Sequence, residues 1–227
     1  MSVKSSVAKT LAPWATVAAP QLTHSFVREA LHRAIHGVGP LPPAAEAAEK
    51  QLAEQHGNVD DGIHEVIENH VRYAGAQGFV TNIGGLVTAT VAIPTNITGL
   101  ALIQSRMVAG IAHLRGYDLA DPRVRNAVLV CILGEDRVDD LVRAAKLPAP
   151  PMALATAPAH DPDLDKVISA EVASELITKI AGKRLATTAA ARRIPFVGGF
   201  VGMGADGFST WRIGRYADRE LLPRARR

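Results

Sequence analysis

Cysteine and aromatic residues are scarce in this chain. Of its 227 residues only Cys131 is a cysteine, and phenylalanine, tryptophan and tyrosine together make up 4%. A lone cysteine excludes an intramolecular disulfide, which fits a reducing compartment. Lys4 and Lys9 stand near the start, but Pro13 and Pro20 break the apolar stretch around them, so no secretory signal is indicated. We therefore expect a cytoplasmic protein, including one peripheral to the inner face of the plasma membrane.

Charge is missing altogether from residues 73–105, a run rich in glycine, threonine and asparagine. Such a run is either a membrane element or the buried centre of a helical fold. Asn82 and Asn96 would need partners within the protein if they entered hydrocarbon. Pro94 removes a helical hydrogen bond, which predicts a bend near Ile93. A buried core or a shallow re-entrant hairpin therefore fits the run better than a single membrane span.

Strand signals are weak, whereas helical periodicity is clear. We predict an all-α protein, a multi-helix bundle around a glycine-rich apolar helical core. We divide it into an N-terminal helical extension, residues 1–57, and a helical domain, residues 58–227, with a proline-rich loop at 147–163. The predicted helices cover residues 21–36, 44–56, 62–76, both arms of the uncharged run to residue 115, 122–133, 136–146 and 163–193, followed by a glycine-rich segment at 196–216.

A second charge-free segment, residues 194–205, is also rich in glycine but is too short to cross a bilayer. Small residues at helical spacing let two helices approach closely. We therefore expect the two uncharged segments to pack together as a central, hairpin-like core. The residues assigned to this packing are Gly84, Gly85, Thr88, Pro94, Gly99, Gly198 and Gly202.

Acidic residues are few toward the C-terminal end. Residues 179–227 contain eleven lysines and arginines against three acidic residues, a net charge of +8, whereas the rest of the chain carries −5. Each Lys or Arg near an anionic bilayer contributes about 1 kcal/mol to binding, so this end is a candidate contact for anionic phospholipid. A solvated basic tail is the alternative. Nucleic acid is not expected, because aromatics do not interleave the basic residues. The residues chosen for the anionic contact are Arg215, Arg219, Arg224, Arg226 and Arg227.

Motifs for catalysis or metal binding are incomplete. His64 and His70 resemble the pair of a zinc-protease helix, but they are six residues apart instead of four and their rings diverge. His32 and His36 have the correct spacing without a third ligand nearby. Cys131 lies in an apolar helix, where a reactive thiolate is not expected. We predict no catalytic residue, metal or cofactor.

Charged and titratable residues within or beside the apolar segments are candidates for a polar core. Arg106 and His113 are seven residues apart and share a helix face. A charge in apolar surroundings is costly unless it is paired, so we expect Asp206 to pair with Arg106, or with Arg212, across the helices. The alternative is a polar site for a head group or a substrate. The full set of candidates is Arg106, His113, Asp118, Asp206 and Arg212.

Several of these segments together resemble the bacterial EcsC family. The resemblance covers roughly residues 60–147 and 170–220. It implies no established reaction or catalytic residue; the family is named for a protein encoded beside an ABC transporter. The matching segments are Gly78-Phe-Val-Thr-Asn-Ile-Gly-Gly-Leu86, Ile93-Pro-Thr-Asn96, Leu102-Ile-Gln-Ser-Arg-Met-Val108, Ile111-Ala-His-Leu-Arg-Gly-Tyr-Asp118, Asp121-Pro-Arg-Val-Arg125, Leu133-Gly-Glu135, Pro195-Phe-Val-Gly-Gly199, Asp206, Ser209-Thr210 and Ile213-Gly-Arg-Tyr-Ala217.

The leading functional hypothesis is a non-enzymatic helical protein that works at the membrane. Its apolar core would embed shallowly or bind a lipid-like ligand, and its basic end would contact anionic phospholipid. One alternative is a hydrolase-type enzyme, which requires Arg106, His113 and Asp206 to converge on a pocket that solvent reaches. Another is a scaffold for a membrane protein complex related to an ABC transporter. The sequence leaves the oligomeric state open.

Overall fold

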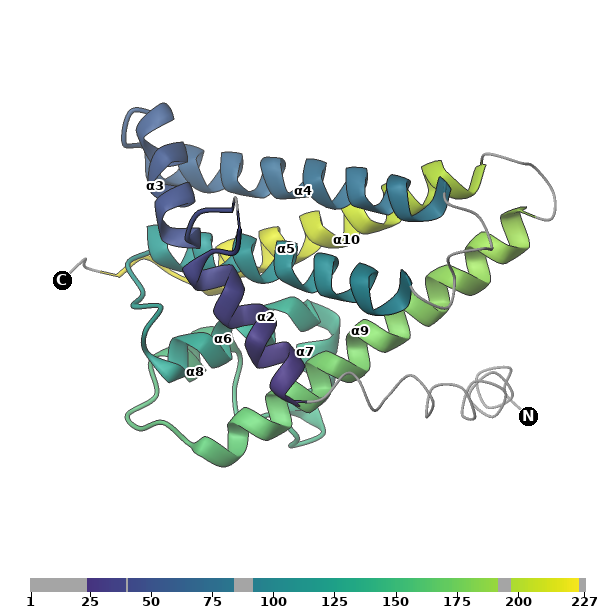
Figure 1. Ribbon diagram of the computed structural model, residues 1–227. Helices are drawn as coiled ribbons and strands as arrows, with labels where there is room; N and C mark the ends of the chain where they lie inside the picture. The colour runs from purple at the N-terminus through teal and green to yellow at the C-terminus, as the bar shows by residue number, and fades with distance from the viewer. Residues whose placement is uncertain (1–23, 40, 84–91, 192–196, 225–227) are drawn as a thin grey trace.

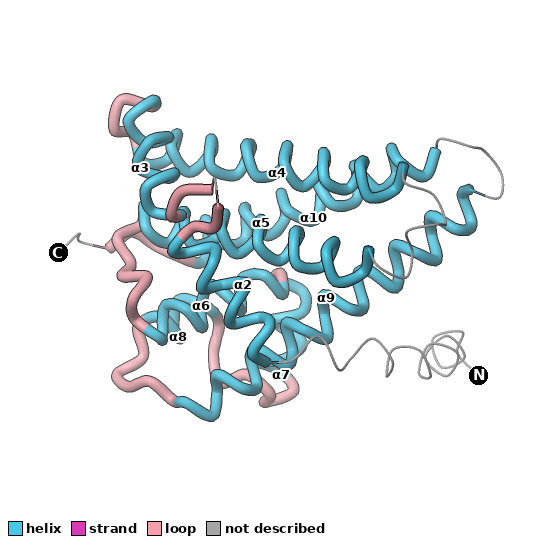
Figure 2. The backbone as a smooth tube through the Cα atoms, viewed as in Figure 1, coloured by secondary structure: helices cyan, strands magenta, loops and turns pink. Residues whose placement is uncertain are grey.

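A computed structural model describes residues 24–39, 41–83, 92–191 and 197–224, and the side chains of residues 25–39, 41–76, 99–179 and 204–224 (Figure 1). Regular structure in these ranges is helical, apart from one isolated bridge between Val38 and Leu41 (Figure 2). The predicted all-α class is confirmed. The helices are α2 (His24–His36), α3 (Ala44–Glu54), α4 (Val59–Ile83), α5 (Ala92–Leu114), α6 (Pro122–Leu133), α7 (Glu135–Arg143), α8 (Pro151–Ala155), α9 (Pro162–Ala191) and α10 (Val197–Glu220).

Helix α5 forms the centre of the bundle. Its residues 104–112 are all buried, which is possible because other helices surround it. It packs against α2, α3, α4, α6 and α10, while α9 runs diagonally past the lower helices (Figure 1). The predicted multi-helix bundle is therefore what the described chain forms.

The first two described helices share this core. Val27 and Leu31 of α2 and Ala48 of α3 belong to the same hydrophobic cluster as Ile111 and Met107 of α5. Residues before 57, which we separated as an extension, thus contribute apolar surface to the packing of the following domain.

Local signals mark several helix ends. Gly116, with φ of +85°, terminates α5: the Tyr117 N–H donates to the Ala112 carbonyl and the Gly116 N–H to the His113 carbonyl. The Asp121 carboxylate accepts the Arg123 N–H at 2.9 Å and caps α6. The proline-rich loop differs from the prediction because it contains the short helix α8.

The uncharged run divides differently from the prediction. Helix α4 continues to Ile83, and α5 is described from Ala92, so Pro94 lies in a first turn instead of at a bend within a helix. A first-turn proline costs no hydrogen bond, because that N–H has no partner within the helix. Predicted packing residues Gly84, Gly85 and Thr88 lie outside the described residues. Of the others, Gly99 is half-buried on α5, and Gly198 and Gly202 belong to the first turns of α10.

Close helix packing is visible at other glycines. A β-carbon on Gly214 of α10 would lie 2.9 Å from Ile67 Cγ1 of α4 and 3.1 Å from Met107 Sδ of α5. A β-carbon on Gly207 would lie 3.6 Å from the Val71 carbonyl oxygen of α4. Glycine therefore brings α10 close to α4, at positions outside the predicted packing set.

Within the described part of the chain, no helix has the length and apolar character needed to cross a membrane.

Candidate functional site

Four helix ends lie together at one end of the bundle (Figure 1, right). Helices α4 and α10 run antiparallel, since Gly214 faces Ile67 whereas Gly207 faces Val71 and Gly75. The C-terminus of α4 therefore lies beside the N-terminus of α10. Short connections join α4 to α5 and α9 to α10, which brings the start of α5 and the end of α9 to the same place. We call this the glycine-rich end: the parts of these helices within residues 73–105 and 176–205.

The charge of the glycine-rich end is of one sign. Residues 73–105 have no charged side chain, and residues 176–205 have five basic residues and no acidic one. Exposed aromatic side chains stand at its margin: Tyr73 of α4 is 63% exposed, and Phe208 of α10 is 62% exposed and stacks on Trp211, with ring centroids 6.0 Å apart. Exposed aromatic side chains thus stand beside a part of the sequence that has no acidic residue.

Arg106 lies near this margin and is buried without a partner among the described residues. It is 8% exposed, the most buried arginine among the described residues. Its guanidinium makes no hydrogen bond or ion pair with any described residue. Burial lowers its pKa, and the Tyr73 and Glu46 groups oppose that shift.

The expected pairings of Asp206 are not found. Among the described side chains, no ion pair joins Asp206 to Arg106. Arg212 instead pairs with Asp136 of α7 at 2.6 Å. The sequence suggested these pairings because the residues share apolar surroundings, but the register between α5 and α10 matches Thr210, not Asp206, with Gln104 of α5, whose Nε2 donates to Thr210 Oγ1 at 3.3 Å.

Most of the arginines chosen for an anionic contact already face other groups. Arg219 pairs with Glu135 at 2.5 Å and Arg215 with Asp218 at 3.3 Å. Arg224 lies 5.5 Å from the ring centroid of Tyr117. The last two, Arg226 and Arg227, lie outside the described residues.

A groove of about 840 Å³ opens at the other end of the bundle, where α5 terminates. His113, Asp118 and Arg224 line it together with Glu49 of α3. His113 Nε2 lies 2.7 Å from Glu49 Oε1, and the Asp118 carboxylate accepts the Ala120 N–H at 2.8 Å, which shapes the rim. The groove holds one histidine–carboxylate pair among groups of both charge signs.

The groove does not bring together the residues that the enzymatic alternative requires. Of Arg106, His113 and Asp206, only His113 lines it.

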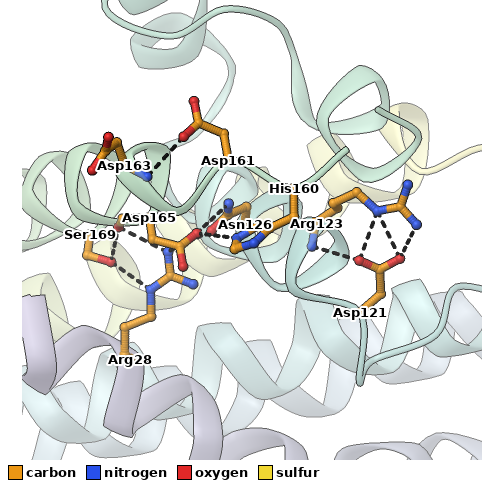
Figure 3. A network of polar contacts seen from close by, with 9 residues as sticks. All are labelled: Arg28, Asp121, Arg123, Asn126, His160, Asp161, Asp163, Asp165 and Ser169. Carbon is orange, nitrogen blue, oxygen red and sulfur yellow. Dashed lines mark hydrogen bonds and ion pairs between the residues drawn. The ribbon is translucent and has the colours of Figure 1, made fainter. Parts of the chain in front are cut away.

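A polar network ties α2, α6 and α9 together (Figure 3). Arg28 donates to Asn126 Oδ1 at 2.6 Å and to Ser169 Oγ at 2.9 Å, and it pairs with Asp165 at 3.3 Å. Asp165 also accepts hydrogen bonds from Asn126 and His160. Burial opposes ionisation of Asp165, but these bonds and the charge of Arg28 outweigh it and lower the pKa of that carboxyl. The network closes on itself and is structural in character.

Two further polar side chains lie in the core, each with one hydrogen bond. His70 is 6% exposed, and its Nδ1 lies 2.7 Å from the Val66 carbonyl oxygen, which makes Nδ1–H the donor. Gln104 Oε1 is buried and accepts no hydrogen bond. Both face the interior between α4, α5 and α10, level with the margin of the glycine-rich end.

The single cysteine is enclosed. Cys131 is 0% exposed, and burial raises the pKa of its thiol far above its ordinary value. Elsewhere in the described chain, no three His, Cys, Asp or Glu side chains are grouped so that they could hold a metal ion.

These features define an all-α protein with a basic, glycine-rich end and a mixed-charge groove opposite. The sequence pattern of the EcsC protein family matches residues 15–224, and the chain belongs to that family. Comparison with curated proteins found no match, and comparison with solved structures found none.

Sequence reasoning identified Arg106 and His113 but missed their neighbours. Glu49, the partner of His113, lies 64 positions away, and the aromatic side chains Tyr73, Phe208 and Trp211 come from two helices. The i, i+3 spacing of Phe208 and Trp211 was a usable signal, because it places both rings on one helix face.

Proposed function

We propose that this EcsC-family protein is a non-enzymatic, membrane-peripheral protein that docks its glycine-rich end on anionic phospholipid. One observation carries the proposal: the described ends of α4, α5, α9 and α10 lie together, and the sequence of these ends, residues 73–105 and 176–205, has basic residues but no acidic one. Carboxylates would repel an anionic surface, and the sequence of this end has none between residues 176 and 205.

The exposed aromatics indicate the level at which the bundle would meet the membrane surface. Tyr and Trp side chains favour the boundary between water and hydrocarbon, where the ring is apolar and the polar atom stays hydrated. Tyr73 and Trp211 lie at the margin of the glycine-rich end, so they would rest at the level of the lipid head groups. Helix α4 continues beyond Tyr73 to Ile83, about 15 Å, so the helix ends would enter about one leaflet of the bilayer.

Two of the arginines predicted to contact the bilayer already have carboxylate partners: Arg215 pairs with Asp218 and Arg219 with Glu135. The sequence of the glycine-rich end offers further basic residues, among them Lys183 and Arg184.

Liposome flotation tests the proposal. The protein should float with vesicles of phosphatidylcholine containing phosphatidylglycerol, and less with phosphatidylcholine alone. Raising the salt concentration from about 0.05 to about 0.5 M shortens the Debye length to about 4 Å. If the contact is electrostatic, binding to the anionic vesicles should then weaken. Resistance to carbonate extraction would indicate insertion. Absence of flotation with anionic vesicles at low salt would rule the proposal out.

A scaffold for a membrane complex is the competing function. It predicts that recruitment depends on a membrane protein, so purified protein would not bind protein-free vesicles. The same flotation experiment therefore separates the two.

A further inference from the structure

We propose that Arg106 binds the phosphate group of an anionic ligand at the margin of the glycine-rich end. This rests on the proposed function only for the source of that phosphate, which would then be a phospholipid head group.

The argument begins with burial. A guanidinium stays protonated in proteins, so burying it without a partner loses hydration and gains nothing. Arg106 is 8% exposed and has neither a hydrogen bond nor an ion pair to a described residue. Arg115 Nε is fully enclosed, but the side-chain nitrogens of Arg106 are not. A ligand can therefore reach the nitrogens of Arg106.

Other partly buried arginines show what a structural role looks like in this fold. Arg28 makes three hydrogen bonds and one ion pair, Arg115 pairs with Asp60 and Asp218, and Arg137 pairs with Glu171. Arg106 differs from all of these, although it is more buried. Glu46 interacts with it only through the electrostatic field.

The neighbours of Arg106 can be placed through its own helix face. One turn beyond Arg106, Gly110 lies against Ala48 and the Ala44 carbonyl of α3 and against Val66 of α4. Arg106 therefore lies on the face of α5 that is turned toward α3 and α4, and Tyr73 of α4 acts on it electrostatically. The planar guanidinium matches two oxygens of a phosphate.

The position also suits a lipid. Tyr73 is mostly exposed, and Arg106 interacts with it electrostatically. A bilayer docked at the glycine-rich end would bring its phosphate layer to the height of these two residues. The acyl chains would then extend toward the uncharged helix ends.

The first test uses inorganic phosphate and thermal unfolding. Phosphate should raise the Tm of the wild type in a concentration-dependent manner at constant ionic strength. Arg106→Met keeps the apolar stem, so it should fold, have a Tm at least equal to the wild type without phosphate, and lose the response. Arg106→Lys keeps the charge but loses the planar guanidinium that can bind two phosphate oxygens at once. It should need about tenfold more phosphate than the wild type for the same rise in Tm. Arg72→Met, an exposed arginine of α4, is the matched control and should respond as the wild type does.

The second test separates the sources of phosphate. If the ligand is a lipid, Arg106→Met should weaken flotation on phosphatidylglycerol vesicles about tenfold, while free phosphate competes poorly. If it is free phosphate, the Tm response alone should depend on Arg106, and flotation should be unchanged.

The inference fails if Arg106→Met changes neither the phosphate response nor flotation relative to Arg72→Met. It also fails if Arg106→Met lowers the Tm while phosphate has no effect on the wild type, since Arg106 would then be structural. Neither result bears on docking itself, because flotation of the wild type measures that separately.

Discussion

Burial controls the protonation of His70. Desolvation lowers the pKa of its imidazole from 6.5 to about 4, although the hydrogen bond to Val66 favours the protonated ring; the nearby charge of Arg106 adds to the lowering. In the unfolded chain the ring keeps its ordinary pKa of 6.5. Between pH 6.5 and 4 the unfolded chain therefore binds more protons than the folded one.

The free energy of unfolding should consequently fall as the pH drops through this range. The full effect is about 3 kcal/mol, present above pH 6.5 and lost near pH 4. Urea unfolding at several pH values measures it. His70→Gln should flatten the dependence, whereas His64→Gln, at an exposed position of the same helix, should keep it. Equal slopes for the wild type and His70→Gln would show that His70 is not the source.

Helix α10 offers a test of packing at the scale of one element. Gly214→Ala would place a β-carbon 2.9 Å from Ile67 and 3.1 Å from Met107. Such overpacking should lower the free energy of unfolding by about 1–3 kcal/mol. Gly204→Ala meets nothing within 4 Å and lies on the same helix, so it should raise stability by up to about 1 kcal/mol through helix propensity. Urea denaturation of both variants checks the opposite signs; the same sign for both would contradict the packing.

The junction of α2, α6 and α9 depends on one carboxylate. Asp165→Ala would leave Arg28, Asn126 and His160 without their shared acceptor. We expect a loss of about 2–4 kcal/mol in the free energy of unfolding. Asp163→Ala, whose side chain is 91% exposed, should cost less than about 1 kcal/mol. If the two substitutions cost the same, the network would not hold these helices together.

Sequence reasoning located elements where a local signal exists. Asp121 and Pro122 set the start of α6, and Gly116 the end of α5, through contacts within a few residues. The C-terminus of α4 was predicted near residue 76, but the helix continues to Ile83. The Ala and Gly residues near position 76 do not stop the helix, because tertiary packing decides where it ends. The ion-pair partners of Arg212 and His113 depend on the relative rotation of distant helices, which a single sequence does not encode locally.

At the scale of the whole molecule, the orientation on a bilayer is the measurable property. Phe208→Ala and Trp211→Ala should each reduce partitioning to phosphatidylglycerol vesicles about tenfold, because each removes roughly 1.5 kcal/mol of apolar transfer free energy. Val167→Ala is the matched control, since Val167 is 41% exposed but lies near the start of α9, away from the glycine-rich end. Quantitative flotation measures all three, and an equal loss for Val167→Ala would contradict the assigned orientation.

Only part of the proposed docking end could be anticipated from the sequence. The missing charge at residues 73–105 and the basic excess after residue 179 were both evident. That the end of α4 lies beside the start of α10 follows from their antiparallel pairing, which close contacts at Gly207 and Gly214 fix.

The enclosure of Cys131 makes the chain ready for site-specific labelling. Because its thiol is 0% exposed and held protonated, a maleimide dye would react with an introduced cysteine and leave the native one untouched. Positions 204 and 220 of α10 are separated by about 24 Å along the helix axis. A dye at position 204 would be quenched by acceptors in the bilayer, whereas a dye at position 220 largely would not. The difference in quenching between the two positions would therefore measure how the protein docks.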